Sequence, residues 1–139
     1  MQKKNCKKVI KAVCKEVAGT REAIGIKLLE YPKESFWSKS TIMSVYFKAT
    51  RDMEDTVADI AGSSSMKDRY ITEDVPYGLV PTSLIAHKFN VDIPIINATI
   101  NLASVINQTD YYQEGRSLKE LGIAHMSRGE LVDILQKGF

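Results

Sequence analysis

Apolar residues recur along this chain at steps of three and four, the spacing that places side chains on one face of a helix. Between Asn5 and Ala18 they form one such stripe: Val9, Ile10, Val13 and Val17. Lysines at positions 3, 7, 11 and 15 line another face. We interpret them as a solvated ridge and not as a nucleic-acid contact, because no aromatic or arginine residue accompanies them. Gly19 and Gly25 predict a break or a short second turn.

The middle of the chain predicts shorter elements. Tyr31–Ser40 contains a proline and several polar breakers, so we expect a loop under which Trp37 packs as an anchor. Thr41–Ala49 and Asp52–Ile60 predict two short helices. Ala61–Ser65 is rich in glycine and serine and predicts a hinge or loop.

The following segment is again helical in pattern. Thr82 or Ser83 can cap a helix that runs to about Phe89. Pro94 then starts a strongly apolar helix, Ile95–Ile106. Because its apolar residues lie on nearly every side, we expect a central buried helix.

Two pairs of residues near the end of the chain have capping-box spacing, Ser117 with Glu120 and Ser127 with Glu130. The first pair predicts a short helix and the second predicts a helix over Arg128–Lys137. The sequence has no alternating strand pattern and no internal repeat, so we predict an all-α fold.

Composition fits one soluble domain over residues 1–139, with 44% hydrophobic residues and a net charge of +2. That charge is too small to imply nucleic-acid binding, and no apolar run is long enough for a membrane span. Cys6 and Cys14 would lie about 12 Å apart along a helix, too far for a disulfide. Two lone thiols without a signal peptide predict a cytoplasmic protein.

The stretch Asp68–Pro81 differs from the rest of the chain. It combines an arginine, two adjacent carboxylates, two tyrosines and a Pro-Tyr-Gly turn. Pro76 disfavours helical backbone at Val75, and Gly78 offers a positive φ, so we expect a rigid loop at the end of an element. Loops of this kind often carry binding and catalytic residues.

The same residues also allow a purely structural interpretation. Arg69 could pair with Glu73 or Asp74 and simply hold the turn together. Ion-pair networks of this kind are a common alternative to a functional site. Residue spacing alone leaves both interpretations open.

The opine dehydrogenases, a family that includes octopine and nopaline dehydrogenases, have a signature that resembles residues 69–81 (RYITEDVPYGLVP). The family's closing motif resembles residues 114–123 (EGRSLKELGI). The resemblance extends from about Lys7 to Lys137 and is weakest between Lys27 and Ile60. It implies an all-α domain like the C-terminal helical domain of opine and 6-phosphogluconate dehydrogenases. The family's N-terminal dinucleotide-binding domain has no counterpart in these 139 residues.

The resemblance also implies a chemistry. Opine dehydrogenases join an amino acid to a 2-keto acid through an imine, which NADH or NADPH reduces. Arg69 matches the arginine that contacts the keto acid, and Asp74 matches the aspartate that orients a catalytic histidine. In the family that histidine comes from an upstream segment, and neither His87 nor His125 stands at its position. We therefore expect NAD or NADP in the complete enzyme and no cofactor on this chain alone.

Two functions remain open at this point. The chain is either the C-terminal substrate and catalytic domain of an NAD(P)-dependent opine dehydrogenase-like oxidoreductase, inactive when isolated, or a non-catalytic helical module. The module would serve oligomerisation or bind a separate dinucleotide-binding chain. Because a domain without its cofactor domain leaves an apolar face uncovered, we expect a homo-oligomer, most simply a two-fold dimer.

Overall fold

The computed structural model describes residues 2–26 and 64–138, with only the backbone given for residues 2–7. Apart from Ser64, these residues belong to one compact unit, Met1–Lys27 together with Ser65–Phe139. The predicted loop with Trp37 and the two helices predicted within residues 41–60 lie outside the described residues. So does most of the predicted hinge at residues 61–65.

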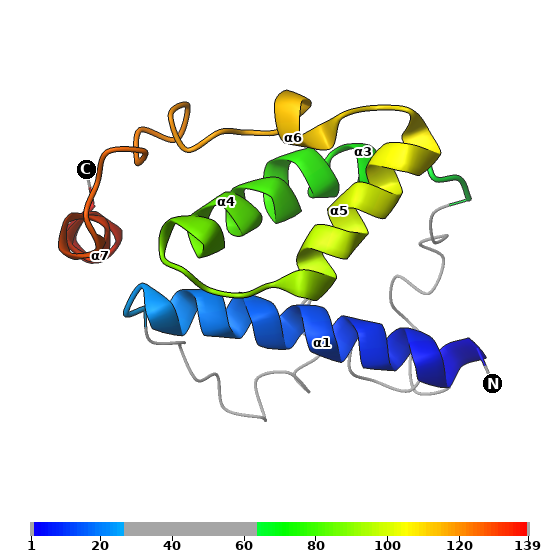
Figure 1. Cartoon of the computed structure of the whole chain (residues 1–139), viewed down its shortest axis with the longest axis horizontal. Coiled ribbons are helices and arrows are strands. Elements are labelled where there is room, and N and C mark those ends of the chain that lie inside the picture. Colours follow the sequence, from blue (N-terminus) through cyan, green and yellow to red (C-terminus); the bar gives the residue numbers. More distant parts are fainter. Residues whose placement is uncertain (1, 27–63, 139) are drawn as a thin grey trace, which may run out of the picture. The chain divides into compact units, whose positions relative to one another are not determined.

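The described residues form helices and turns and include no strand, which confirms the predicted all-α fold (Figure 1). One element, η3, is a π-helix and the others are α-helices. In chain order they are α1 (Gln2–Ala23), α3 (Arg69–Thr72), η3 (Val75–Leu79), α4 (Val80–Lys88), α5 (Pro94–Asn107), α6 (Tyr111–Glu114) and α7 (Arg128–Lys137).

Helix α1 is longer than the sequence pattern predicts. The predicted break at Gly19 is wrong, because this residue lies within the helix. A glycine inside a helix costs only about 1 kcal/mol relative to alanine, and packing of Val13 and Val17 against the core can offset that cost. The helix ends at Gly25, whose φ of +82° is easily adopted by glycine, and the Ile26 N–H bonds back onto its last turn.

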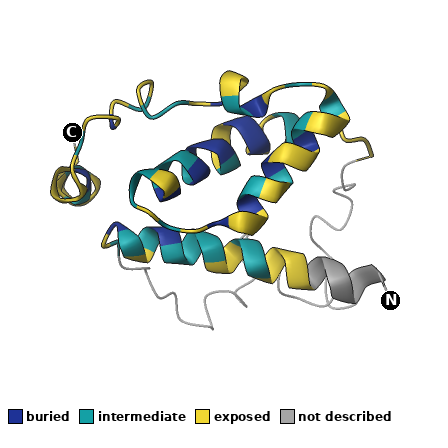
Figure 2. Cartoon of the chain, viewed as in Figure 1, coloured by how far each residue is buried: buried dark blue, intermediate teal, exposed yellow. Residues whose placement is uncertain are grey.

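The main core lies where α1, η3, α4 and α5 contact one another (Figures 1 and 2). Helix α1 contributes Val13 and Val17 to it, whereas Val9 and Ile10 are exposed, so only half of the predicted stripe is covered. The buried residues of this core are Val75, Val80, Ala86, Ile93, Ile96, Ile100, Ala103 and Tyr111.

Helix α5 confirms the predicted start at Pro94 and the predicted length. The expectation that it is buried on all sides is wrong, because only one face packs against the core (Figure 2). On the other face Leu102 is 62% exposed and Val105 is 76% exposed. Although no residue of this helix is charged, the described residues leave one of its faces exposed.

Glu16 joins α1 to the beginning of α5. Its two carboxylate oxygens each accept a hydrogen bond, from the N–H groups of Ile95 and Ile96, both at 2.8 Å. Helix α5 has no cap from its own chain neighbours, since Ile93 occupies the cap position and Pro94 has no N–H. The carboxylate thus satisfies orphan donors at a helix end that carries partial positive charge.

Helix α4 begins earlier than predicted, and neither Thr82 nor Ser83 caps it. The chain enters α4 already helical from η3, so no free N-terminus is left to cap. The Thr82 hydroxyl instead donates to the carbonyl of Gly78 at 2.8 Å, and Ser83 is fully buried. The predicted end near Phe89 is confirmed.

The C-terminal capping boxes form as predicted. The Ser127 hydroxyl accepts from the Glu130 N–H, the Glu130 carboxylate accepts from the Ser127 N–H, and α7 follows. Ser117 and Glu120 make the same contacts, but a hydrogen-bonded turn follows them and not a helix. The helix predicted there is wrong because Gly122, with a φ of +72°, closes the turn.

A second, smaller core holds the C-terminal segment to the end of α1. Its buried residues are Ile24, Ile123 and Leu131. No helix among the described residues is both long enough and apolar enough to cross a membrane.

Candidate functional site

Residues 69–81, which the sequence predicts to be a rigid loop, are helical. Helix α3 passes through Glu73 and Asp74, both with right-handed helical φ and ψ, directly into η3 and α4 (Figure 1). The predicted extended residue before Pro76 and the predicted positive φ at Gly78 are both wrong. The proline is tolerated because it lies in the first turn of η3, where its missing N–H is least needed. Single-turn π-helices are frequent at functional sites.

Arg69 and Asp74 are exposed and form no ion pair with each other or with Glu73 in the described part of the chain. The Arg69 guanidinium lies over the ring of Tyr70, 5.3 Å from its centre. The structural alternative, in which Arg69 pairs with a neighbouring carboxylate, is therefore not observed. Both side chains are available to a ligand.

Pro81 determines what the carbonyl of Pro76 binds. In a π-helix each carbonyl accepts from the N–H five residues on, and Val80 donates to Val75 in this way. The corresponding partner of Pro76 is Pro81, which has no N–H. The Pro76 carbonyl accepts instead from the N–H of Arg116, at 3.0 Å. The signature segment and the closing segment, far apart in sequence, thus meet through the backbone.

Gly115 makes this contact possible. It is buried, and a Cβ at this position would lie 2.6 Å from the Tyr111 carbonyl oxygen and 2.8 Å from that of Pro76. Only glycine fits such an approach without movement of the backbone. The next side chain, Arg116, places its guanidinium 5.5 Å from the centre of the Tyr77 ring.

A polar cluster that sequence analysis missed joins α4, α5 and α6. The Oδ1 of Asn97 accepts hydrogen bonds from the hydroxyls of Ser83 at 2.8 Å and Tyr112 at 3.1 Å. The amide nitrogen of Asn97 therefore faces the Nε2 of His87, at 3.3 Å, and donates to it. His87 is exposed. Polar residues inside apolar helices, such as Ser83 and Asn97, were the available signal.

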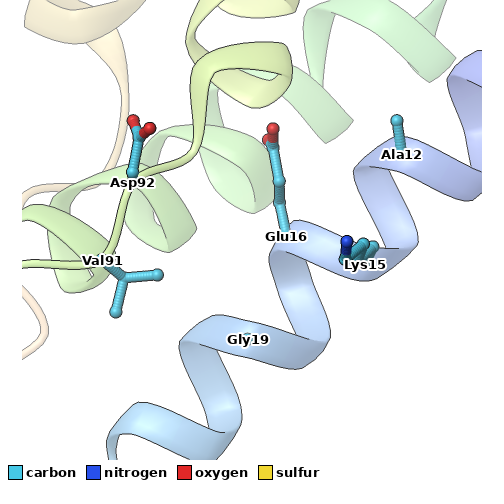
Figure 3. Close-up of a pocket in the computed structure, with 6 residues that line it drawn as sticks. All are labelled: Ala12, Lys15, Glu16, Gly19, Val91 and Asp92. Atoms are coloured by element: carbon cyan, nitrogen blue, oxygen red, sulfur yellow. The ribbon is translucent and has the colours of Figure 1, made fainter.

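A shallow cavity of about 350 Å³ lies between α1 and the connection from α4 to α5. Figure 3 shows Glu16 reaching from α1 toward the beginning of α5, where its carboxylate is already hydrogen-bonded. The lining residues are Ala12, Lys15, Glu16, Gly19, Val91 and Asp92. None belongs to the signature or the closing segment, so the candidate site is the exposed surface from α3 to η3, which includes Arg69 and Asp74, and not this cavity. Within residues 2–26 and 64–138 no cluster of His, Cys, Asp and Glu suits a metal ion.

The described residues thus form an all-α unit that carries the signature segment across α3, η3 and the beginning of α4. Residues 3–107 match the family described as NAD/NADP octopine/nopaline dehydrogenase, alpha-helical domain. The chain belongs to this family, as its sequence signature predicts. The closing segment at residues 114–123 lies outside the matched residues.

Two curated relatives agree with this assignment. An opine dehydrogenase of Arthrobacter sp. (strain 1C) is 41% identical over 68 residues, which are 49% of this chain and 19% of the relative. A vitopine synthase of Allorhizobium ampelinum (strain ATCC BAA-846 / DSM 112012 / S4) is 25% identical over 105 residues, which are 76% of this chain and 28% of the relative. The chain thus matches less than a third of the length of either relative.

Proposed function

We propose that this chain supplies the substrate-binding and catalytic part of an NAD(P)-dependent opine dehydrogenase. The complete enzyme condenses an amino acid with a 2-keto acid and reduces the imine to a secondary amine. Arg69 binds the carboxylate of the keto acid, and Asp74 orients the catalytic histidine. The observation that carries the proposal is the exposure of both side chains on one helical segment without an ion pair between them.

The proposed reaction requires a cation that holds the keto acid carboxylate and a group that exchanges a proton at the keto acid's carbonyl. The planar guanidinium of Arg69 can hold a carboxylate through two parallel hydrogen bonds, which fixes the direction of the adjacent carbonyl group. Asp74 accepts a hydrogen bond from one imidazole nitrogen of the histidine. The other nitrogen is then free to exchange a proton with the carbonyl oxygen of the keto acid. Asp74 also stabilises the imidazolium that forms. We expect another segment of the complete enzyme to supply this histidine, since neither His87 nor His125 stands at the position of the family's catalytic histidine.

The described residues do not fit a dinucleotide. A pyrophosphate is usually held by a glycine-rich turn between a strand and a helix, and residues 2–26 and 64–138 include no strand. NAD or NADP supplies the hydride when it is bound by a dinucleotide-binding domain or chain. We expect the isolated 139-residue chain to bind NADH weakly, and micromolar affinity in titration calorimetry would contradict this expectation.

A complete enzyme, assembled from this chain and a dinucleotide-binding domain of the family, tests the proposal. Oxidation of NADH or NADPH should require both an amino acid and a 2-keto acid, and mass spectrometry should detect a secondary amine with two carboxylates. A panel of amino acids and keto acids would also identify the substrates. The isolated chain serves as the control. Oxidation with the keto acid alone, or none across the panel, would refute the proposal.

The alternative is a non-catalytic helical module for oligomerisation or for binding another chain. The observation that favours it is the uncovered apolar face of α5, which carries Leu102, Val105 and Ile106. A module of this kind would form a stable complex with a dinucleotide-binding domain but would not support turnover. The same assembled enzyme therefore separates the two functions.

A further inference from the structure

We propose that Arg116 is a second carboxylate-binding residue of this site and takes the carboxylate of the amino acid. The inference rests on the proposed function and deepens it, because it assigns a residue to the second substrate. Both substrates of the proposed reaction carry a carboxylate. Arg69 provides for one of them, and the fold brings another arginine against the same helical segment.

A row of side chains connects the two arginines. Arg69, Glu73 and Tyr77 follow one another at four-residue steps on continuous helical backbone, with the N–H of Glu73 bonded to the Arg69 carbonyl and that of Tyr77 to the Glu73 carbonyl. Residues four apart lie on the same face of a helix. The row is about 12 Å long at 1.5 Å per residue, and Arg116 lies over the ring at its far end.

The position of Arg116 is fixed while its charge stays available. Its N–H donates to the Pro76 carbonyl, and the preceding Gly115 has no room for a side chain. These two contacts fix the backbone position of Arg116. The carboxylate of Glu120 already accepts hydrogen bonds from the N–H and hydroxyl of Ser117, which lower its pKa, and the charge of Arg116 contributes to the same shift. Arg116 forms no ion pair in the described part of the chain. Its side chain is exposed, and its guanidinium lies over the Tyr77 ring.

The charge order along this row matches the expected product. An opine has two carboxylates on either side of a secondary ammonium group. The row presents a cation at Arg69, a carboxylate at Glu73 and a cation at Arg116, the complementary order. Opposite charges in register favour ligands with two carboxylates around a cation over ligands with a single carboxylate.

Binding of iminodiacetate to the full 139-residue chain tests the inference. This probe carries two carboxylates on one secondary amine, and N-methylglycine, with one carboxylate, is its matched control. In NMR titrations we expect iminodiacetate to bind about fivefold more tightly than N-methylglycine, the scale of one exposed charge pair. Arg116→Gln and Arg69→Gln should each abolish this preference. Lys119→Gln removes a nearby exposed positive charge and should preserve it.

The other outcomes are equally informative. No preference in the unmodified chain, or an unchanged preference in Arg116→Gln, would overturn the assignment of Arg116. If Arg116 only holds the two segments together, Arg116→Gln would lower the melting temperature and weaken both ligands equally, which would also overturn it. The proposed function fails separately, by lack of turnover in the complete enzyme.

Discussion

Arg69 forms no ion pair with a carboxylate among the described residues, although two carboxylates follow it within five residues. It stacks on Tyr70 instead, and Asp74 points its own charge into solvent. An unpaired exposed charge contributes little to folding stability. Substitution of these two side chains should therefore change folding stability little, in line with the binding and catalytic roles proposed above.

Glu120 gives a prediction at the level of a single residue. The Ser117 N–H, helped by the Ser117 hydroxyl, lowers the pKa of this carboxyl from its ordinary value of 4.5. Because the folded-state pKa is lowered, the stabilisation is present above about pH 4.5 and is lost as the pH falls through the folded-state value. Ser117→Ala should raise the pKa of Glu120, measured by NMR titration. An unchanged pKa would show that the Ser117 hydroxyl does not donate to this carboxylate in solution.

Glu16 provides a prediction about how two helices are held together. Glu16→Gln leaves only one acceptor for the two N–H groups of α5 and removes the negative charge at its N-terminus. We expect a loss of about 1 kcal/mol in the free energy of unfolding, the usual value of a helix cap. Urea denaturation measures it. Glu22→Gln, at an exposed position of the same helix, is the control and should change stability by much less.

The contact between the signature and closing segments depends on Gly115. A methyl group there would press against two backbone oxygens, so Gly115→Ala should lower the free energy of unfolding by about 1–3 kcal/mol. Gly129→Ala is the matched control, since this glycine lies in α7 with no atom near its missing Cβ. That change should be neutral or stabilising. Equal behaviour of the two variants would contradict the close packing of Gly115.

Local signals predicted some elements well and others not at all. The bounds of α5 and α7 follow from Pro94 and from the capping box at Ser127, whose effects are confined to a few neighbouring residues. The signature segment was misjudged because Pro76 reads as a breaker, whereas the π-helix places it where its missing N–H does no harm. The role of Gly115 depends on tertiary contact, which spacing along the chain does not reveal.

Some residues of the candidate site could be found from the sequence, and one could be found only from the structure. Arg69 and Asp74 could be singled out because residues 69–81 resemble the family's signature, whereas residue spacing alone left a structural ion pair open. Arg116 could not, since its place beside Tyr77 arises only when the Pro76 carbonyl is left free by Pro81.

For the whole molecule, the uncovered face of α5 predicts association. This helix has no charged residue, Leu102 and Val105 are exposed on it, and proteins seldom leave a large contiguous apolar patch in water. We expect the chain to form a homo-oligomer in light scattering, and Val105→Glu to dissociate it. Gln136→Glu adds the same charge to α7 and should leave the assembly intact. A monomer across a wide concentration range would refute this prediction.

The assignment of Arg69 and Asp74 is tested by steady-state kinetics of the complete enzyme. Arg69→Lys keeps the charge but loses the bidentate hydrogen bonding to the carboxylate. It should therefore raise the KM for the keto acid and affect the KM for the amino acid less. Asp74→Asn should lower kcat by a factor on the order of a hundred, because an amide can favour the wrong histidine tautomer and does not stabilise the imidazolium. Arg128→Lys, on α7, is the control and should leave all constants unchanged. If both variants instead lower the melting temperature and damage every kinetic constant alike, the two residues serve the fold and not the reaction.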